Sequence, residues 1–538
     1  MKQLNLGKFP GRRGAPPAGD RWGKGEIFVW ATAGAVTVTF GILALLIGVV
    51  LVNGLGFFWP SPVASVSLRD GRVFLGEITA REEIPAGGWR MQLKIGNRDL
   101  YGLDFRWIPE DDVAAIVFPR DAAVLERQQF GNFYGTLRSL APPPGTGGSG
   151  EGWAGLESGL EAIAQLDAAL EPLRERVENL ARRLGAARRP APAGPRGGGG
   201  PQRAARLAEK LAAASRQLAA GTAELRSFGA TFAEAGGREH TVALVDIVRA
   251  YRPNGLGFWG KMAIYFSKLG ELLTGEPREA NTEGGLLPAI FGTVMMVLLM
   301  SFFSIPLGVI AAIYLREYAR DGALVRLVRI AVFNLAGVPS IVYGVFGLGF
   351  FVYGLGGSID RFFFSERLPT PTFGTGGILW ASLTLALLTV PVVIVATEEA
   401  FASIPRGIRE GSLSLGATQF QTLVRVLLPM ATPGILTGFI LAMARAAGEV
   451  APLMITGVVK LAPSLPLDGN FPFLHLERKF MHLGFHIFDV GFQSPNVEAA
   501  KPMVYVTTLL LVLIVLLMSL GAIFLRNSMR KRFQTATF

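Results

Sequence analysis

The sequence has no cysteine and few charged residues for its length. Because cysteine is absent from all 538 residues, a disulfide framework, a thiolate metal site and a cysteine nucleophile are excluded. Only 17% of the residues are charged, whereas 50% are hydrophobic, and the mean hydropathy is +0.39. A soluble protein of this size usually has more charge and fewer apolar residues. The composition therefore indicates a membrane protein.

The sequence also lacks the motifs of several enzyme classes. It has no G-x-x-x-x-G-K-[ST] phosphate-binding loop, so any ATP hydrolysis must be carried out by another polypeptide. Among the four histidines, His482 and His486 have i,i+4 spacing, but no carboxylate or third ligand is arranged nearby. We expect these two histidines to lie on a surface stretch outside the membrane. We expect no metal, no cofactor and no catalytic residue.

The surplus of positive charge has a simple explanation in a membrane protein. The formal net charge is +11 and the pI is about 10.0, values that could also suggest nucleic-acid binding. Inner-membrane proteins, however, concentrate Lys and Arg in their cytoplasmic loops. We therefore expect membrane lipid, and no nucleic acid, to contact this chain.

Six apolar runs are long enough to cross a bilayer, which needs about 20 residues per helix. These runs are Ile27–Val52, Leu287–Leu315, Ile330–Leu355, Ile378–Ala396, Gly434–Val458 and Met503–Leu525. The first is longer than a signal-peptide core and has no small-residue cleavage site after it, so we interpret it as a retained span. The fold class predicted is an all-α multi-spanning membrane protein with six transmembrane helices.

Basic residues near the span ends predict the orientation, because Lys and Arg are enriched on the cytoplasmic side. The N-terminal segment and the C-terminal tail are both basic. Their basic residues are Lys2, Lys8, Arg12, Arg13, Arg21, Lys24, Arg526, Arg530, Lys531 and Arg532. We therefore expect a protein of the cytoplasmic (inner) membrane with both termini on the cytoplasmic side. The loops Arg316–Arg329 and 397–432 then lie on the same side. The long segment Asn53–Gly285 must lie outside.

The first part of this extracytoplasmic insert has a strand pattern. From Val63 to Phe118 apolar and polar residues alternate in short stretches, separated by turn signals at Asp70-Gly71 and Gly96-Asn97. This pattern predicts a small β unit.

The second part of the insert has a helical pattern. Apolar residues recur at spacings of three and four from Leu156 to Leu184, and a second such run extends from Leu207 to Phe228. A Pro/Gly linker, 189–201, separates the two runs. This spacing predicts an antiparallel coiled-coil hairpin. Its two possible roles, a spacer without a partner and a docking arm for another subunit, remain open.

The loop after the fourth span has a distinct local pattern. A short helix is expected from Pro405, with a glycine break at Gly416, a cap at Thr418, and a second helix stopped by Pro429 and Pro433. The sequence therefore predicts a rigid helix-turn-helix on the membrane surface.

The same loop resembles the coupling-helix signature of prokaryotic ABC importer permeases. The matching positions are Glu410, Gly416, Val426, Leu428 and Pro429, with Ala417 and Thr418 beside the glycine. The sequence departs from the family where two alanines are common, since Gly411 and Ser412 stand there, and Val426 replaces a frequent Ile. The resemblance implies a loop that docks into a groove on a separate ATPase dimer and transmits its closure to the spans.

Four further stretches resemble the phosphate-specific transport permeases. These are Gly285–Thr293, Ile305–Tyr318, Asn334–Gly344 and Ala444–Leu453. Gly448–Leu453, with the later Phe492–Pro495, favours the A-type (PstA-type) subunit. The resemblance implies an ABC importer permease fold, alternating access, a second related permease and a periplasmic phosphate-binding protein.

Two charged residues in the fifth run point to the same function. Arg445 and Glu449 lie four residues apart within an apolar span, and charges at that depth pair with each other or face a polar pathway. The planar guanidinium suits a tetrahedral oxyanion. We expect Arg445 to be an anion contact or gate and Glu449 its counter-ion, although a purely structural ion pair explains the spacing equally well. Thr293, Asn334 and Ser340 could line the route or could join helices, and we favour the joining role.

The predicted organisation divides the chain into seven segments. They are 1–26, cytoplasmic; 27–52, first span; 53–150, β-rich unit and linker; 151–235, hairpin; 236–286, linker; 287–525, permease core with coupling loop 397–432; and 526–538, basic tail. The predicted function is a non-enzymatic permease subunit for inorganic phosphate. The alternatives are a permease for another oxyanion, molybdate or sulfate, and a membrane scaffold or sensor acting through the hairpin.

Overall fold

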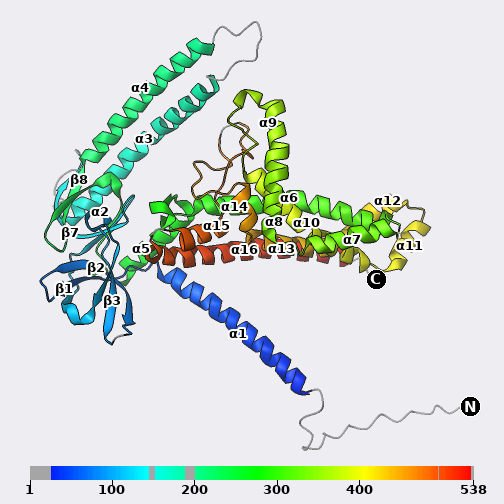
Figure 1. Cartoon of the computed structure of the whole chain (residues 1–538), viewed down its shortest axis with the longest axis horizontal. Coiled ribbons are helices and arrows are strands. Elements are labelled where there is room, and N and C mark those ends of the chain that lie inside the picture. The colour runs from blue at the N-terminus through cyan, green and yellow to red at the C-terminus, as the bar shows by residue number, and fades with distance from the viewer. Residues whose placement is uncertain are drawn as a thin grey trace, which may run out of the picture.

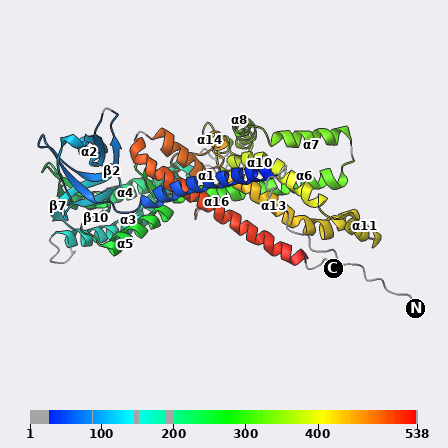
Figure 2. The same cartoon turned by 90° about the horizontal axis from the view of Figure 1, so that it is seen from below.

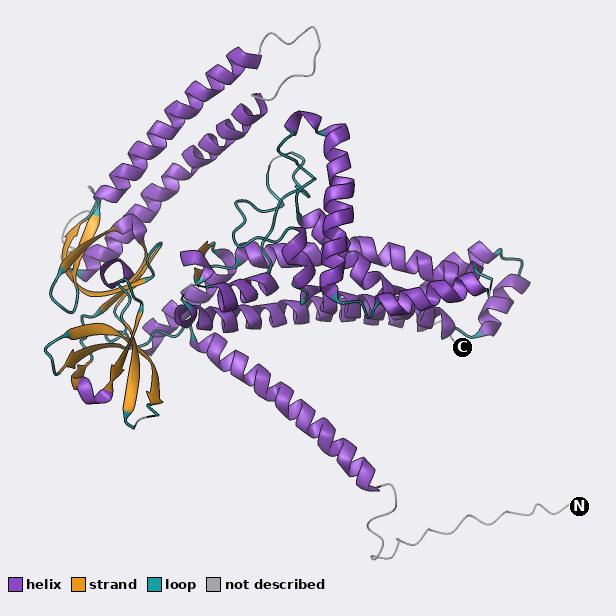
Figure 3. Cartoon of the chain, in the orientation of Figure 1, coloured by secondary structure: helices purple, strands orange, loops and turns teal. Residues whose placement is uncertain are grey.

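The computed structural model describes residues 26–85, 87–143, 152–187, 200–320, 322–469, 471–494 and 496–534. The predicted basic N-terminal segment, most of the predicted 189–201 linker and residues 535–538 lie outside this part of the chain. The described residues form an elongated molecule: several helices of the C-terminal half run side by side along its longest axis, other long helices diverge from that axis, and the strands gather at one end (Figures 1 and 3).

Six helices among the described residues are long and apolar enough to cross a membrane, as predicted. They are Phe28–Gly56, Leu287–Tyr318, Ser340–Phe363, Ile378–Ala402, Gln419–Ala447 and Val497–Lys531. The first belongs to α1 (Glu26–Gly56), whose side chains are exposed along most of its length. It contacts α16 (Val497–Gln534) near its end, where a Cβ on Gly54 would lie 3.3 Å from the carbonyl oxygen of Tyr505. An apolar helix with this exposure suits a lipid environment.

The predicted bounds of the third and fifth spans are wrong. The apolar run from Ile330 is broken before Pro339, which cannot donate a backbone hydrogen bond and disfavours helix at the residue before it. The third span therefore starts at Ser340. The fifth starts earlier than predicted and ends at Ala447, because Gly448 interrupts the helix while the apolar sequence continues.

The core half of the chain is made of helices. The elements are α6 (Leu287–Ile313), η4 (Tyr314–Tyr318), α7 (Ala323–Leu335), α8 (Ser340–Phe346), η5 (Gly347–Gly356), α9 (Gly357–Phe363), η6 (Ser365–Arg367), α10 (Ile378–Ala402), α11 (Arg406–Ser414), α12 (Gln419–Thr422), η7 (Leu423–Leu427), α13 (Leu428–Ala447), α14 (Ala451–Thr456), α15 (Leu483–Phe488), η8 (Asp489–Gln493) and α16. The helices α6, α10 and α13 pack around one apolar cluster. Their backbones approach closely at glycines: a Cβ on Gly438 would lie 2.3 Å from the Cβ of Ala396. Small residues at such contacts are typical of packed membrane helices.

Between α1 and α6 the chain forms two five-stranded antiparallel sheets. The first has the order β4-β3-β2-β1-β5, with strands β1 (Val63–Leu68), β2 (Val73–Glu83), β3 (Trp89–Lys94), β4 (Phe105–Pro109) and β5 (Val113–Val117). The second has the order β10-β6-β7-β8-β9, with strands β6 (Ala123–Arg127), β7 (Asn132–Ala141), β8 (Gly229–Ala233), β9 (Glu239–Ala243) and β10 (Ile247–Tyr251). The short elements α2 (Arg98–Tyr101), η1 (Glu110–Asp112), η2 (Leu244–Asp246), β11 (Pro277–Arg278), η3 (Glu279–Asn281) and β12 (Glu283–Gly284) complete this region.

The first sheet occupies the region where the small β unit was predicted, but the second sheet was missed. Its strands lie on both sides of the hairpin, so the expected linker 236–286 contains β9, β10 and a helix, α5 (Phe258–Thr274). The five-residue strands β8 and β9 are rich in Ala and Thr and carry little alternation of large apolar side chains. The description of an all-α protein with a small β unit therefore understates the β structure.

The two predicted hairpin helices are present as α3 (Trp153–Ala187) and α4 (Gly200–Ser227). They lie side by side and project away from the second sheet (Figure 1). Their facing residues are close: a Cβ on Gly221 would lie 2.9 Å from Leu170. The predicted seam residues of α3 are buried or half-buried except Leu166, while Pro172 lies inside the helix without ending it. The root of the hairpin joins the apolar core of the second sheet.

The sheets and the loop α11–α12 lie at opposite ends of the helix bundle (Figures 1 and 2). The C-terminal end of α16 lies at the α11–α12 end. Because α16 runs between them over 38 residues, about 57 Å at 1.5 Å per residue, the two ends are far enough apart to occupy opposite sides of a bilayer.

Candidate functional site

The loop between α10 and α13 has the predicted local structure. Helix α11 starts after Pro405 and ends at Ser414, and Gly416 follows with a positive φ of 85°. Thr418 caps α12: its hydroxyl accepts a hydrogen bond from the backbone N–H of Gln421, whose side chain accepts from the N–H of Thr418. A Cβ on Gly416 would meet no atom within 4 Å, so glycine is favoured there by its backbone conformation and not by lack of space.

Side chains from several helices hold this loop against the bundle. The guanidinium of Arg409 on α11 lies 2.7 Å from the carboxylate of Glu317 in η4, which continues α6. The hydroxyls of Ser412 and Thr422 lie 2.9 Å apart and link α11 to α12. Under the loop, α10 and η7 contribute an apolar cluster that includes Phe401. Helix α11 is therefore connected by direct contacts to the helix that continues α6 and to the apolar cluster between α10 and α13.

The tip of the loop presents apolar side chains to solvent. Leu415 is 91% exposed and Phe420 is 66% exposed, on either side of Gly416. Glu410 is also exposed, whereas Ala417, Leu428 and Pro429 are half-buried. Two exposed apolar residues held by a capped turn are suited to binding a groove on a partner. Sequence reasoning did not single out Leu415 or Phe420, although an apolar residue directly before a turn glycine was a usable signal.

The expectation that Pro429 and Pro433 stop the second helix is wrong. The chain continues from α12 through η7 into α13, which contains both prolines. Pro429 stands in the first turn of α13, where its missing N–H does not disrupt the helix. The loop is therefore directly continuous with the fifth span.

At the other end of α13 the predicted ion pair is present. Arg445 Nε lies 3.7 Å from Glu449 Oε1. Arg445 belongs to the last turn of α13, whereas Glu449 lies beyond Gly448, in the break before α14. The two side chains are 36% and 22% exposed, so neither is sealed inside the bundle. The pair thus bridges a helix end and the break that follows, and the Arg445 guanidinium is partly accessible.

Helix α8 lies close to this ion pair. Tyr343 is near enough to Arg445 to interact with its charge, and the tyrosine hydroxyl donates to the carbonyl of Leu335, 2.7 Å away. Helix α8 also packs tightly on α14, because a Cβ on Gly344 would lie 2.8 Å from Pro452 Cα. The start of the third span therefore lies beside the break after α13.

The other predicted route residues lie in different settings. Thr293 is fully buried; its hydroxyl donates to the carbonyl of Ala289 at 2.7 Å and accepts from the N–H of Leu483 at 2.9 Å. The bond from Leu483 attaches the start of α15 to α6, whereas the bond to Ala289 lies within α6. Asn334 is exposed on α7, and Ser340 is half-buried at the start of α8. Thr293 thus contacts a second helix, and its role, in the route or in joining helices, stays a prediction.

The structure contradicts the expectation for the two spaced histidines. His482 is 0% exposed and His486 is 2% exposed, so the pair is buried at the α15–α16 contact and does not form a surface stretch. His486 Nδ1 lies 3.2 Å from the hydroxyl of Thr507. Burial lowers the pKa of His482 to about 3 and that of His486 to about 4. Within the described residues no group of three potential ligands could hold a metal ion.

A second ion pair near the loop was not predicted. Arg329 on α7 lies 3.6 Å from Glu398 on α10 and donates to the carbonyl of Leu315 at 3.1 Å. Arg329 and Glu398 are 69 positions apart in the sequence and lie on different helices, so spacing along one helix could not reveal the pair. It ties α7 to the ends of the two helices that support the loop.

The fold and these sites define a multi-spanning membrane protein with a structured surface loop. Residues 304–533 match the family described as binding-protein-dependent transport system inner membrane component. A phosphate transport system permease protein PstA of Xylella fastidiosa is 31% identical over 256 residues, which cover 46% of this chain and 76% of that protein. A probable ABC transporter permease protein YqgI of Bacillus subtilis is 32% identical over 223 residues, covering 40% and 70%. The chain belongs to this family of transport-system membrane components.

Other relatives agree with the resemblance to phosphate permeases. A probable phosphate transport system permease protein PstA of Methanocaldococcus jannaschii is 35% identical over 197 residues, covering 36% of this chain and 63% of that protein. The chain spans about three fifths of the length of several such relatives. Among solved structures, an inward-facing MetNI methionine ABC transporter overlaps 45% of this chain and 95% of that chain at 20% identity, with a TM-score of 0.34. A TM-score of 0.34 does not establish a shared fold.

Proposed function

We propose that the chain is a permease subunit of an ATP-driven importer that carries inorganic phosphate across the cytoplasmic membrane. The observation that supports this most is the capped α11–α12 loop, which is fixed to α6 through Arg409 and Glu317 and continues directly into α13. The choice of phosphate as the substrate rests on the PstA relatives. Because the sequence has no phosphate-binding loop for ATP, hydrolysis is the task of a separate ATPase dimer.

The loop and the ion pair stand at the two ends of one helix. Helix α13 has 20 residues, which corresponds to about 30 Å. We propose that Leu415 and Phe420 enter a groove on the ATPase, with Glu410, Gly416, Ala417 and Thr418 keeping the turn rigid. Closure of the ATPase dimer then displaces α11, and α13 transmits the displacement through Leu428 and Pro429 to its far end.

At that far end we propose that Arg445 contacts the anion and that Glu449 is its resting counter-ion. The break at Gly448 separates the two side chains, so a shift of α13 relative to α14 changes the 3.7 Å separation. When the pair opens, the guanidinium can donate to phosphate oxygens instead. Asn334 and Ser340, on either side of the break between α7 and α8, are the polar residues we assign to the route; Thr293 is assigned to helix joining.

We propose a topology with both termini and the α11–α12 loop in the cytoplasm and the sheets and hairpin outside. The separation of the loop from the sheets along α16 supports this arrangement. The partners are an ATPase dimer, a second related permease, a periplasmic phosphate-binding protein and membrane lipid.

The test is transport by the reconstituted complex. Vesicles containing this chain, the second permease, the ATPase and the binding protein are supplied with ATP and either phosphate, sulfate or molybdate. We expect ATP-dependent accumulation of phosphate alone. Accumulation of sulfate or molybdate in place of phosphate would leave the assignment as an importer intact but contradict phosphate as the substrate. Uptake without the ATPase would contradict the assignment as an ATP-driven importer.

A scaffold or sensor role has one observation in its favour, which is the projecting hairpin of α3 and α4. The hairpin can be shortened without touching its root: Leu170 faces Gly221, so residues 171–220 can be replaced by a short turn. The core residues Leu156, Ile163 and Leu225 then remain in the second sheet. A scaffold predicts loss of function in the shortened chain, whereas the permease predicts uptake close to that of the full chain.

A further inference from the structure

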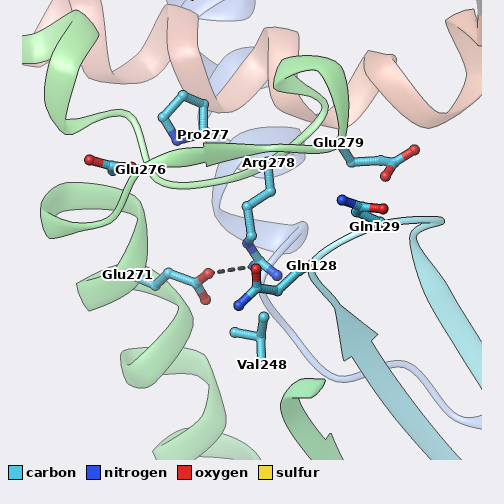
Figure 4. A pocket seen from close by; sticks show the side chains of 8 residues that line it. All are labelled: Gln128, Gln129, Val248, Glu271, Glu276, Pro277, Arg278 and Glu279. Atoms are coloured by element: carbon cyan, nitrogen blue, oxygen red, sulfur yellow. Dashed lines mark hydrogen bonds and ion pairs between the residues drawn. The ribbon is translucent and has the colours of Figure 1, made fainter. Parts of the chain in front are cut away.

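Helix α5 has three faces with different surroundings. Its polar face is attached to the second sheet: Lys268 Nζ lies 2.6 Å from Glu126, and Arg249 lies 3.0 Å from Glu271. Glu271 also pairs with Arg278, and this pair lies in the groove between α5 and the sheet (Figure 4). These contacts fix the rotation of α5 about its own axis.

The second face of α5 belongs to the apolar core at the ends of the spans. Leu272 is buried, and Tyr265 and Leu269 are half-buried, against residues of α6 and α16 that include Ala289 and Met503. The polar face and the core face together account for two sides of the helix.

The third face is apolar and exposed. It consists of Trp259, Ala263, Phe266, Gly270 and Leu273, at spacings of four, three, four and three residues. Such spacing places all five side chains on one stripe of a helix. Trp259 is 80% exposed, Phe266 60% and Leu273 42%. Within the described residues nothing covers this stripe.

Both ends of α5 are attached where spans meet the insert. At its start, the ring of Phe258 lies 5.9 Å from that of Trp59, which follows the end of α1, and Tyr265 lies 6.1 Å from Phe58. At its end, the N–H of Leu286 donates to the carbonyl of Leu272 at 2.7 Å, and α6 starts at the next residue. Helix α5 therefore contacts the chain directly after the first span, α1, and directly before the second span, α6.

We propose that α5 lies in the membrane surface on the side of the insert, with its Trp259–Leu273 stripe inserted among the lipid acyl chains. A 17-residue helix is about 25 Å long and carries Lys261, Lys268 and Glu271, so it suits the interface and not a span. Trp259 and Trp59 at its start are residues typical of the interfacial belt.

Lipid is the favoured occupant because the stripe lies beside the exposed apolar surface of the first span. Phe258, the neighbour of Trp259 at the start of α5, packs on Trp59 just after α1, whose apolar side chains are exposed along the span. Since the opposite polar face is ion-paired to the sheet, α5 also fixes the tilt of the whole insert relative to the bilayer. This inference depends on the membrane spans and not on the transported substrate.

The absence of cysteine makes a site-specific test direct. Single cysteines are introduced at Ala263 and Gly270 on the stripe and at Ser267 on the polar side, and each is labelled with a nitroxide. A Cβ at Gly270 meets no atom within 4 Å, so the label fits there without disturbing the fold. The labelled full chain is placed in vesicles of phosphatidylethanolamine and phosphatidylglycerol. Collision rates with oxygen, which concentrates in lipid, and with a water-soluble nickel chelate are then compared.

We expect the ratio of oxygen to nickel collisions to be several-fold higher at Ala263→Cys and Gly270→Cys than at Ser267→Cys. A label at Leu45→Cys on α1 gives the value for lipid, and one at Ser215→Cys on the exposed side of α4 gives the value for water. Nickel accessibility at the stripe equal to that at Ser215→Cys would overturn the proposal. Protection from both reagents would also overturn it, because a protein partner would then cover the stripe.

Discussion

The hydroxyl side chains buried in the core helices and the charged side chains buried in the insert between α1 and α6 have different kinds of partner. In the core, buried hydroxyls bond to the backbone of their own helix: Ser301 donates to the carbonyl of Val297 at 2.6 Å, and Thr389 to that of Leu385 at 2.9 Å. In the insert, the buried polar groups include charges, such as Arg127, which lies 2.9 Å from Asp99.

The difference follows from the solvent around each half. A helix in lipid must satisfy its polar groups locally, and small uncharged residues do so at little cost. A domain in water has enough charged side chains to form networks, and those remain stable when every member is paired. Burial would raise the pKa of Glu126, but Lys268 and Arg249 beside it lower that pKa to about 2. The insert thus keeps a buried carboxylate ionised.

The largest expected effect comes from removing that carboxylate. Glu126→Gln leaves Lys268 and Arg249 without their shared partner, and breaking a buried pair in this way costs about 3 kcal/mol or more. We expect earlier thermal unfolding of the insert, measured by proteolysis of the full chain during heating. The control Glu82→Gln removes an exposed partner of Arg90 and should change stability by less than about 0.5 kcal/mol. Equal effects of the two changes would contradict the distinction between buried and exposed pairs.

A bulky residue at a helix contact tests the corresponding feature of the core. Gly438→Leu places a side chain where even a Cβ would lie 2.3 Å from Ala396, and we expect about 1–3 kcal/mol of destabilisation. A Cβ at Gly521 meets no atom within 4 Å, so Gly521→Leu is the matched control and should be nearly neutral. The yield of monodisperse protein in detergent measures both. If the two variants behave alike, close packing of α10 on α13 does not stabilise the core.

The two regions should also lose stability in different pH windows. His482 and His486 have lowered pKa values, so below pH 6.5 the unfolded chain binds more protons than the folded one, and stability falls toward pH 3–4. The pKa of Glu126 falls from 4.5 to about 2, so its contribution is complete above pH 4.5 and is lost between pH 4.5 and 2. We expect His486→Asn to flatten the upper part of a plot of melting temperature against pH and Glu126→Gln to flatten the lower part. Identical profiles for both variants would refute this separation.

The smallest expected effect concerns the loop between α11 and α12. Gly416→Ala forces a side chain into a backbone with φ of 85°, which costs about 1 kcal/mol. At Gly407, inside α11, a Cβ meets no atom within 4 Å, and Gly407→Ala should stabilise the helix by about 0.5–1 kcal/mol. Binding of the ATPase subunit to the two variants gives the readout. We expect weaker binding for Gly416→Ala alone, and weakening by both would show that the turn conformation is not the cause.

The sequence predicted best what depends on neighbouring residues. The number of spans, the turn at Gly416, the cap at Thr418 and the pairing of Arg445 with Glu449 all follow from local spacing, and the structure has each of them. The span bounds failed where apolar composition continued across a helix break, as at Gly448. Hydropathy does not report such a break, whereas glycine and proline do.

What the sequence did not predict depends on residues far apart in the chain. Arg409 and Glu317 are 92 residues apart, and the strands of the second sheet are separated by the whole hairpin. The burial of His486 requires α15 to pack on α16, which no single helical pattern indicates. Long-range pairing of this kind is set by tertiary packing and not by local propensity.

The proposed mechanism requires α13 to connect Arg445 to the α11–α12 loop, which we propose binds the ATPase. The direct measurement compares ATP hydrolysis and phosphate uptake in reconstituted vesicles for the intact chain, Arg445→Ala and Gly416→Pro. We predict that Arg445→Ala keeps ATPase binding and hydrolysis but loses at least tenfold in uptake, about 1.4 kcal/mol, and that Gly416→Pro loses both. Normal phosphate uptake by Arg445→Ala would contradict the proposed role of Arg445 as an anion contact. The Arg445–Glu449 pair would then be a structural contact.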